Sequence, residues 1–397
     1  RGFIIMVEKW GPCSAEMVND NFVRKGAKAT IVFSPWTPSI TENFRDTCAS
    51  CLAHRSDIPF MVLQESDELV NAVRDDPSTT ISLFPDYNIW ETAFSSWHYQ
   101  LLIRWLPAII FCQASVTAAI FIHQHYGLIC NDFRNTPLSQ NNDRSRFMRF
   151  LWSRTGYPQL ALIIALFHCL LVGSTLGIGG LFSTSNLPAR VFLFFATQNG
   201  GMEYVVTILS SAFWNGKVAE VINIQYCPLL IKIFPGNSRK SIVLLCFFVL
   251  CLDLGASSLY ATYFEYVYPI FNQVNGALFL TLEVTLGSHF LWGAILFQSE
   301  YRKLTSKLSR TCNSSRQGMD RLLTRLSYCA LGLGITMLLQ SAALVIMSTP
   351  AFYTVEGWTI LWSTTCVTSS CKLTLLVHLF RPRNDDQVHI HPEQTNF

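Results

Sequence analysis

Apolar residues after Leu101 fall into seven long runs that are separated by polar segments. A transmembrane helix needs about 20 mostly apolar residues to cross about 30 Å of hydrocarbon. Each run has roughly that length, so the pattern predicts a helix at each. The seven expected membrane-spanning helices cover residues 105–123, 158–179, 191–213, 241–262, 271–297, 326–347 and 357–378.

The first hundred residues have a different pattern, with short apolar runs and clear break points. The segment GFIIMVE predicts a β-strand, which Gly11 and Pro12 interrupt. A helix capped by Ser14 is expected next, because the apolar residues that follow recur at helical spacing. Gly26 occupies the position where a left-handed residue ends a helix, and ATIVF predicts the following strand.

A second unit of the same kind follows a polar connecting loop. PFMVLQ predicts a strand, SDELVNAVR a helix and TISLF another strand. Two successive strand–helix–strand units predict a small α/β domain over residues 1–92. The rest of the chain divides into a linker (93–104), a seven-helix membrane domain (105–380) and a tail (381–397).

Composition agrees with a chain that lies mostly in lipid. Half of the 397 residues are hydrophobic, only 14% are charged and the mean hydropathy is +0.30. A soluble domain carries about 25% charged residues. The expected fold class is therefore an α-helical polytopic membrane protein with a small N-terminal α/β domain.

Lys and Arg residues are concentrated in alternate connections between the predicted spans. Short loops rich in these residues stay on the cytoplasmic side of a membrane. Eighteen lie in the first, third and fifth connections and the tail, whereas the opposite connections contain only Arg190. This asymmetry predicts a cytoplasmic C-terminus and, with an odd number of spans, an extracytoplasmic N-terminus. It leaves open whether the membrane is the plasma membrane or an endomembrane.

Several residues of the α/β domain occur in an order known from one family. They are Gly11, Cys13, Ser14, Gly26, Ala27, Ala29 and Ile31, followed by Ile58 and Pro59 ahead of the second unit. This series resembles the protease-associated (PA) domain over about residues 2–86. The chain departs from the family at Glu68, where Gly is common, and the family's first strands would precede Arg1. We therefore expect upstream sequence, including a signal peptide that is removed.

The resemblance implies a recognition role for the α/β domain. PA domains are non-catalytic lids or recruitment modules that contact proteins or peptides, and they occur on proteases, sorting receptors and membrane proteins of the secretory and endosomal route. It therefore implies a protein or peptide ligand at the ectodomain. The candidate partner-binding loop contains Trp36 and Phe44.

Three cysteines, Cys13, Cys48 and Cys51, lie in the predicted ectodomain. Either Cys13 forms a disulfide with Cys48 or Cys51, or Cys48 pairs with Cys51 and leaves Cys13 over. A C-x-x-C spacing can also hold zinc or perform redox chemistry, but no second Cys/His pair lies nearby. We expect a disulfide here, and no metal or cofactor.

Ionisable residues within the predicted spans are the main candidates for function, because a buried charge in a membrane is costly unless it is paired or faces a cavity. We expect Lys372 to pair with Glu203 or Glu283. The network either locks helices together, or contacts a ligand or ion, or acts as a signalling switch. Its predicted members are Glu203, Asp253, Glu283, His289 and Lys372, and His168 and Gln340 also lie within spans.

The layout is that of a seven-helix receptor, but the motifs of rhodopsin-like receptors are missing. The third span ends in FWNGKVAE where those receptors have D-R-Y, and CKLTLLVHLF in the seventh has nothing like N-P-x-x-Y. We expect a receptor-like or sorting protein without enzymatic activity. Its expected partners are the lipid bilayer, the ectodomain ligand and a cytoplasmic signalling partner at the basic loop 298–325. No nucleic-acid partner is expected.

Three other classes fit the sequence less well. An ion or solute transporter or channel would use the intramembrane charges, but no inverted repeat is visible. A relative of the intramembrane aspartyl proteases would need two aspartates, one as acid and one as base, and only Asp253 is suitably placed. A PA-type ubiquitin ligase would need a cysteine-rich RING, and the tail has no cysteine.

Overall fold

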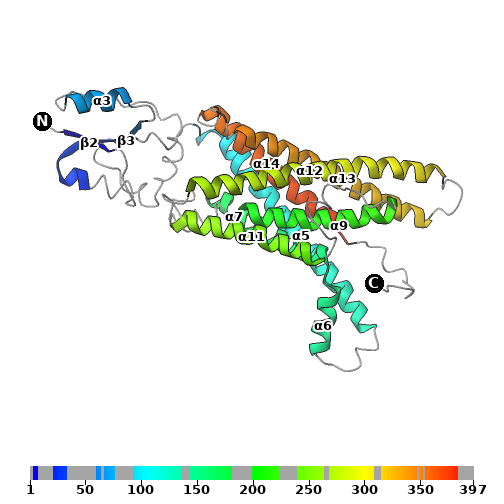
Figure 1. The fold of residues 1–397 in the computed structure, drawn as a ribbon. Coiled ribbons are helices and arrows are strands. Elements are labelled where there is room, and N and C mark those ends of the chain that lie inside the picture. Colours follow the sequence, from blue (N-terminus) through cyan, green and yellow to red (C-terminus); the bar gives the residue numbers. More distant parts are fainter. Residues whose placement is uncertain are drawn as a thin grey trace.

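The protein consists of a bundle of long helices and a small parallel β-sheet (Figure 1). In Figure 1 the sheet lies beyond the end of the bundle at which the first membrane helix begins. The computed structural model describes residues 3–7, 21–33, 60–63, 67–76, 93, 95–135, 144–180, 199–222, 239–262, 268–307, 314–346, 349, 351 and 354–382.

Six helices in the described part of the chain are long and apolar enough to cross a membrane, so this is an α-helical multi-pass membrane protein. They match the first, second and fourth to seventh predicted runs. The six candidate spans are Tyr99–Arg134 (η1, Tyr99–Trp105, and α5, Leu106–Arg134), Tyr157–Ile178 (α7), Ser241–Ser258 within α11 (Arg239–Thr262), Gly276–Ser299 within α12 (Tyr268–Lys307), Thr324–Val345 within α13 (Ser314–Val345) and Val355–Leu379 (α14).

A further helix, α9 (Asn199–Ile222), overlaps the third predicted run. Residues 191–198 of that run lie outside the described ranges. Every residue of α9 from Glu203 to Ser211 is buried. This part of α9 is therefore interior to the bundle, and Thr207, Ser210 and Ser211 face other helices.

Local sequence signals account for the ends of α7. Pro158 stands in the first turn, where its missing N–H costs nothing. The Gln159 side chain accepts a hydrogen bond of 2.8 Å from the backbone N–H of Gly156, as in a capping box. After Ile178 the chain leaves the helix through Gly180, which has a φ of +62°.

Contacts at both ends of the bundle show that α5 and α14 run in the same direction and α7 runs in the opposite one. At one end Tyr99 stacks on Trp358, with ring centroids 6.3 Å apart. At the other end His125 Nε2 lies 2.9 Å from the carbonyl oxygen of Phe380. Arg104, near the start of the first span, donates hydrogen bonds to backbone carbonyls at the end of α7. α5 and α7 are therefore antiparallel.

Similar contacts orient α13 and α9. Arg325, near the start of the span Thr324–Val345 in α13, donates a hydrogen bond to the carbonyl of Arg381. Gln340, near the end of that span, contacts Lys372, so α13 is antiparallel to α14. α9 is parallel to both α14 and α12. The pairs that show this are Glu203–Ser369 and Phe213–Phe380 with α14, and Tyr204–Phe279 and Trp214–Phe297 with α12.

Three parallel strands form the described sheet, in the order β1 (Phe3–Val7), β2 (Ala27–Phe33), β3 (Phe60–Leu63). A parallel pair needs a crossover connection, which fits the strand–helix–strand pattern of the sequence. A helical turn at residues 21–24 precedes β2, and Gly26 ends it with a φ of +85°. Ile31 of β2 is fully buried. α3 (Asp67–Asp75) follows β3 as the sequence predicts, and the predicted strand at 80–84 lies outside the described residues.

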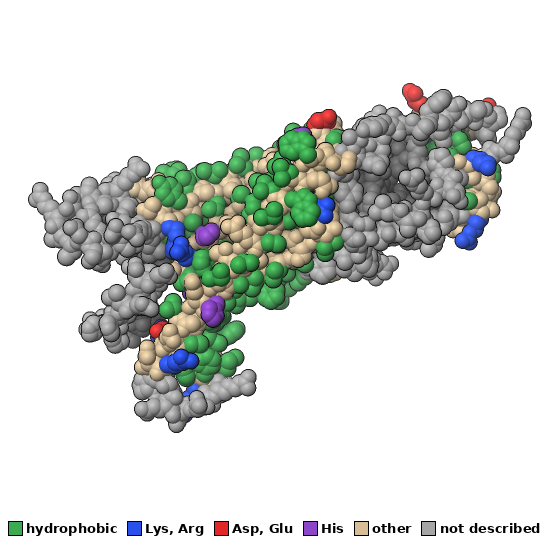
Figure 2. Space-filling view, turned by 180° about the vertical axis from the view of Figure 1, so that it is seen from behind, with side chains coloured by type: hydrophobic (Ala, Val, Ile, Leu, Met, Phe, Trp, Pro, Cys, Tyr) green, Lys and Arg blue, Asp and Glu red, His purple; other side chains and the backbone are tan. Residues whose placement is uncertain are grey.

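The outer surface of the helical bundle is apolar along its middle, and the Lys and Arg side chains that are drawn lie toward its ends (Figure 2). Each of the six candidate spans exposes at least one large apolar side chain, as expected for contact with lipid tails. One example from each, in chain order, is Ile109, Phe167, Leu244, Trp292, Leu339 and Ile360.

Candidate functional site

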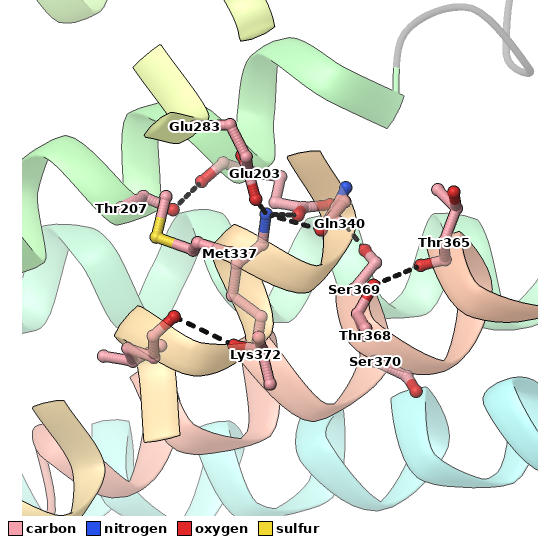
Figure 3. Close-up of polar contacts among 12 residues, drawn as sticks. Glu203, Thr207, Glu283, Met337, Gln340, Thr365, Thr368, Ser369, Ser370 and Lys372 are labelled. Carbon is pink, nitrogen blue, oxygen red and sulfur yellow. Dashed lines mark hydrogen bonds and ion pairs between the residues drawn. The ribbon is translucent and has the colours of Figure 1, made fainter. Parts of the chain in front are cut away.

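Lys372 lies at the point where α9, α12, α13 and α14 meet, and its side chain is fully buried (Figure 3). Its Nζ forms ion pairs with Glu203 of α9 and Glu283 of α12, the latter at 2.8 Å. It also donates a hydrogen bond of 3.0 Å to Gln340 Oε1 of α13. One ammonium group therefore connects three neighbouring helices to α14.

Glu203 has partners on two further sides. The Ser369 hydroxyl, one turn before Lys372 on α14, donates a hydrogen bond of 2.6 Å to Glu203 Oε2. His168 of α7 approaches the same oxygen, with its Nε2 at 3.7 Å, and is itself buried. Glu203 thus connects α9 to α7 as well as to α14. These contacts compensate part of the cost of removing a carboxylate from water.

Tyr204 covers the other side of the ion pairs. Its ring centroid lies 5.5 Å from Lys372 Nζ, a distance suited to a cation–π interaction. Its ring also stacks on Phe279, with centroids 4.6 Å apart. The ammonium group is therefore enclosed by protein groups from each helix around it.

The buried cluster contains more carboxyl groups than amino groups. Two carboxylates, Glu203 and Glu283, face one ammonium group, and His168 is the nearest further group that could carry positive charge. Removing one partner of a buried ion pair is costly because it leaves an uncompensated charge. The cluster can thus hold the helices in one arrangement. It can also let the single ammonium group exchange between two carboxylates.

Asp253 lies beside this cluster and contacts the backbone of α9. Its Oδ2 accepts a hydrogen bond of 3.0 Å from the backbone N–H of Gly201, one turn before Tyr204. The approach is so close that a Cβ atom on Gly201 would lie 2.6 Å from Asp253 Cβ. Asp253 therefore holds α11 against the beginning of α9.

The structure does not bring His289 into the cluster. His289 is buried on α12, and its closest described ring neighbour is Phe290, at 6.0 Å. It lies six positions after Glu283, and at 100° per residue such positions point in clearly different directions around a helix. Of the five predicted members, the described contacts join Glu203, Glu283 and Lys372, Asp253 contacts α9 beside them, and those of His289 do not reach them.

Sequence reasoning missed two members, Ser369 and Tyr204. Ser369 precedes Lys372 by three positions, which places both on one face of a helix, so a search for polar residues at this spacing would have found it. Tyr204 follows Glu203 directly and carries no comparable signal. Gln340 and His168 were noted in the sequence, and both lie in contact with the cluster.

The candidate residues of the ectodomain lie outside the described ranges. These are Trp36 and Phe44 of the predicted partner-binding loop and the three cysteines Cys13, Cys48 and Cys51. The eight cysteines that are described all have free thiols. Among the described residues, no group of three or more His, Cys, Asp or Glu side chains is arranged to hold a metal ion.

No protein-family model, curated protein or solved structure matches the chain. Fold and site together define an α-helical multi-pass membrane protein whose bundle core contains a buried cluster of ionisable side chains.

Proposed function

We propose that the protein has seven membrane spans, with α9 as the third. α5, α9, α12 and α14 run in one direction, and α7 and α13 run in the other. In a chain that crosses the membrane seven times, consecutive spans run in opposite directions. Spans one, three, five and seven, here α5, α9, α12 and α14, therefore share one direction. A chain that did not cross between α7 and α11 would break this alternation. The distribution of Lys and Arg favours an extracytoplasmic N-terminus and a cytoplasmic C-terminus.

We further propose that residues 1–92 form a PA-like recognition domain on the extracytoplasmic side. Three parallel strands, the left-handed Gly26 before β2 and α3 after β3 support this proposal. The ligand would be a protein or a peptide, in keeping with the resemblance. The protein would then act as a receptor-like or sorting protein, and the role involves no catalysis.

In the mechanism we infer, ligand binding at the ectodomain changes the relative strength of the two ion pairs that Lys372 forms. The observation that carries this inference is the sharing of one ammonium group by carboxylates from two different helices. A small movement of α14 relative to α9 and α12 would strengthen one ion pair and weaken the other. Two discrete arrangements of packed helices are then available, and a ligand shifts their populations by its difference in affinity for them.

Proximity labelling on the outer face of living cells tests the recognition role. A labelling enzyme fused ahead of residue 1 should repeatedly mark a secreted protein or peptide with the full chain but not with a chain that lacks residues 1–92. The marked molecule should then bind the purified full chain, and Lys372→Met should change the response of the helices to it. If the two chains mark the same proteins, the ectodomain has no recognition role.

One observation favours a second candidate, an ion or solute transporter. The cluster holds more carboxylates than ammonium groups, as a site that takes up a proton or a cation would. Purified protein in liposomes distinguishes the two candidates. Ion flux that Glu283→Gln abolishes, together with no protein ligand, would favour transport. Ligand binding without flux would favour the receptor-like role.

A further inference from the structure

The short helix α6 (Arg144–Arg154) connects the first two candidate spans and is unusually basic. Its sequence, RSRFMRFLWSR, contains four arginines and no acidic residue. Arg149 donates a hydrogen bond to Ser145 of its own helix, and the Arg154 guanidinium lies 5.6 Å from the centroid of the Phe150 ring. Both arginines are exposed.

One side of α6 packs against the end of α5 through aromatic rings. Phe133 contacts Phe147 and Phe150, with centroids 5.2 and 5.3 Å apart. Met148 and Trp152 lie one turn apart on a different side of α6 and are 55% and 81% exposed. The apolar surface of α6 therefore extends beyond the part that α5 covers.

The position of α6 in the chain restricts where this surface lies. α6 ends at Arg154, and the candidate span α7 begins at Tyr157. Five residues, even when fully extended, cover only about 17 Å, so Trp152 cannot be far from the membrane boundary. The headgroup layer on each side of a bilayer is about 5–8 Å thick. α6 thus stands beside that layer.

We propose that α6 is an interfacial helix that binds anionic phospholipids of the leaflet on its side of the membrane. Met148 and Trp152 enter the boundary between headgroups and acyl chains, where Trp is favoured. Arg149, directly after Met148, contacts the lipid phosphates, and Arg154, beside Phe150, adds to the positive charge of the helix. The absence of acidic residues in α6 makes its charge complementary to such a surface.

Hydrogen exchange of the full chain in lipid nanodiscs tests this proposal. The backbone amides of residues 144–154 should exchange more slowly in discs that contain phosphatidylserine than in discs of phosphatidylcholine alone. Arg149→Gln with Arg154→Gln should remove this difference. Each basic residue near an anionic surface contributes about 1 kcal/mol, so the pair changes lipid affinity roughly 30-fold.

Two comparisons make the test specific. Arg24→Gln with Lys25→Gln removes the same charge from exposed positions near β2 and should leave the lipid dependence intact. Arg149→Lys with Arg154→Lys keeps the charge and should retain it as well. Exchange of the α7 amides must stay unchanged in each variant, which shows that the bundle is folded.

Three results would overturn the proposal. The first is equal exchange of α6 in the two lipid compositions. The second is a lipid dependence that survives the loss of both arginines. The third is unchanged exchange after Met148→Ser with Trp152→Ser, because α6 would then not be inserted and its exposed face would serve a different partner, such as a protein.

Discussion

Lys372 of α14 and Glu283 of α12 form an ion pair of 2.8 Å in which neither side chain is exposed to solvent. Their helices also meet α9 at this point, because Glu203 binds the same ammonium group. An ion pair without contact to water is weakly screened by salt and depends strongly on its geometry. Stability and helix arrangement should therefore respond sharply to changes at these residues.

Replacement of Lys372 by Met should destabilise the bundle by about 3–5 kcal/mol, because it leaves two buried carboxylates without their common cation. The free energy of unfolding in mixed micelles, followed by circular dichroism, measures the effect. Thr281→Val is a suitable control. Thr281 is exposed on α12, and its hydroxyl bonds only to the Ala277 carbonyl of the same helix.

A compensated variant separates charge from packing. Glu203→Gln and Glu283→Gln, added to Lys372→Met, remove all three charges, and replacement of a complete buried ion cluster is often close to neutral. We expect the triple variant to recover most of the lost stability. If it is no more stable than Lys372→Met alone, packing of the lysine stem rather than charge explains the loss.

Gly201→Ala should weaken the contact between α9 and α11. The added methyl group would lie 2.6 Å from both Cβ and Oδ2 of Asp253, so the helices must separate or the Asp253–Gly201 hydrogen bond must break. Overpacking of this kind costs about 1–3 kcal/mol. The same unfolding measurement applies.

Gly216→Ala is the matched control, since Gly216 lies on the same helix and a Cβ there would meet nothing within 4 Å. Alanine favours a helix over glycine by up to about 1 kcal/mol. Gly216→Ala should therefore be neutral or slightly stabilising. Equal destabilisation by both substitutions would mean that α9 does not pack on Asp253 as described.

Most of the membrane fold could be predicted from apolar runs, because a helix that faces lipid must be apolar along its length. α9 shows where this signal weakens. Its residues from Glu203 to Ser211 face other helices, so Thr207, Ser210 and Ser211 are tolerated. Helix ends were also predicted poorly, since α12 continues to Lys307 after its apolar run ends.

The cluster could be predicted only in part. Because a charge is costly to bury, the sequence identified Glu203, Glu283 and Lys372 as residues that need partners. In the structure Lys372 forms an ion pair with each of the two glutamates. Which ionisable residues meet depends on how the helices rotate and cross, which no single run of sequence contains. His289 satisfies the same criterion of burial and yet lies apart for this reason.

Arg104→Gln should loosen the end of α7. The guanidinium donates hydrogen bonds of 3.2 and 3.0 Å to the carbonyls of Leu176 and Gly177, which have no partner within a regular helix end. Hydrogen bonds to a charged group contribute about 1.5–3 kcal/mol, so amide exchange at residues 176–180 should rise about tenfold or more. Arg74→Gln, on exposed α3, should leave exchange there unchanged.

The proposed seven-span topology predicts that the two connections of α9 lie on opposite sides of the membrane. An epitope inserted near residue 186 should bind antibody on intact cells, together with one near residue 40. An epitope near residue 230 should bind only after permeabilisation, together with one at the C-terminus. If the epitopes at 186 and 230 behave alike, α9 does not cross. Should the epitope at 40 be reached only after permeabilisation, the α/β domain is on the cytoplasmic side and cannot meet a secreted ligand.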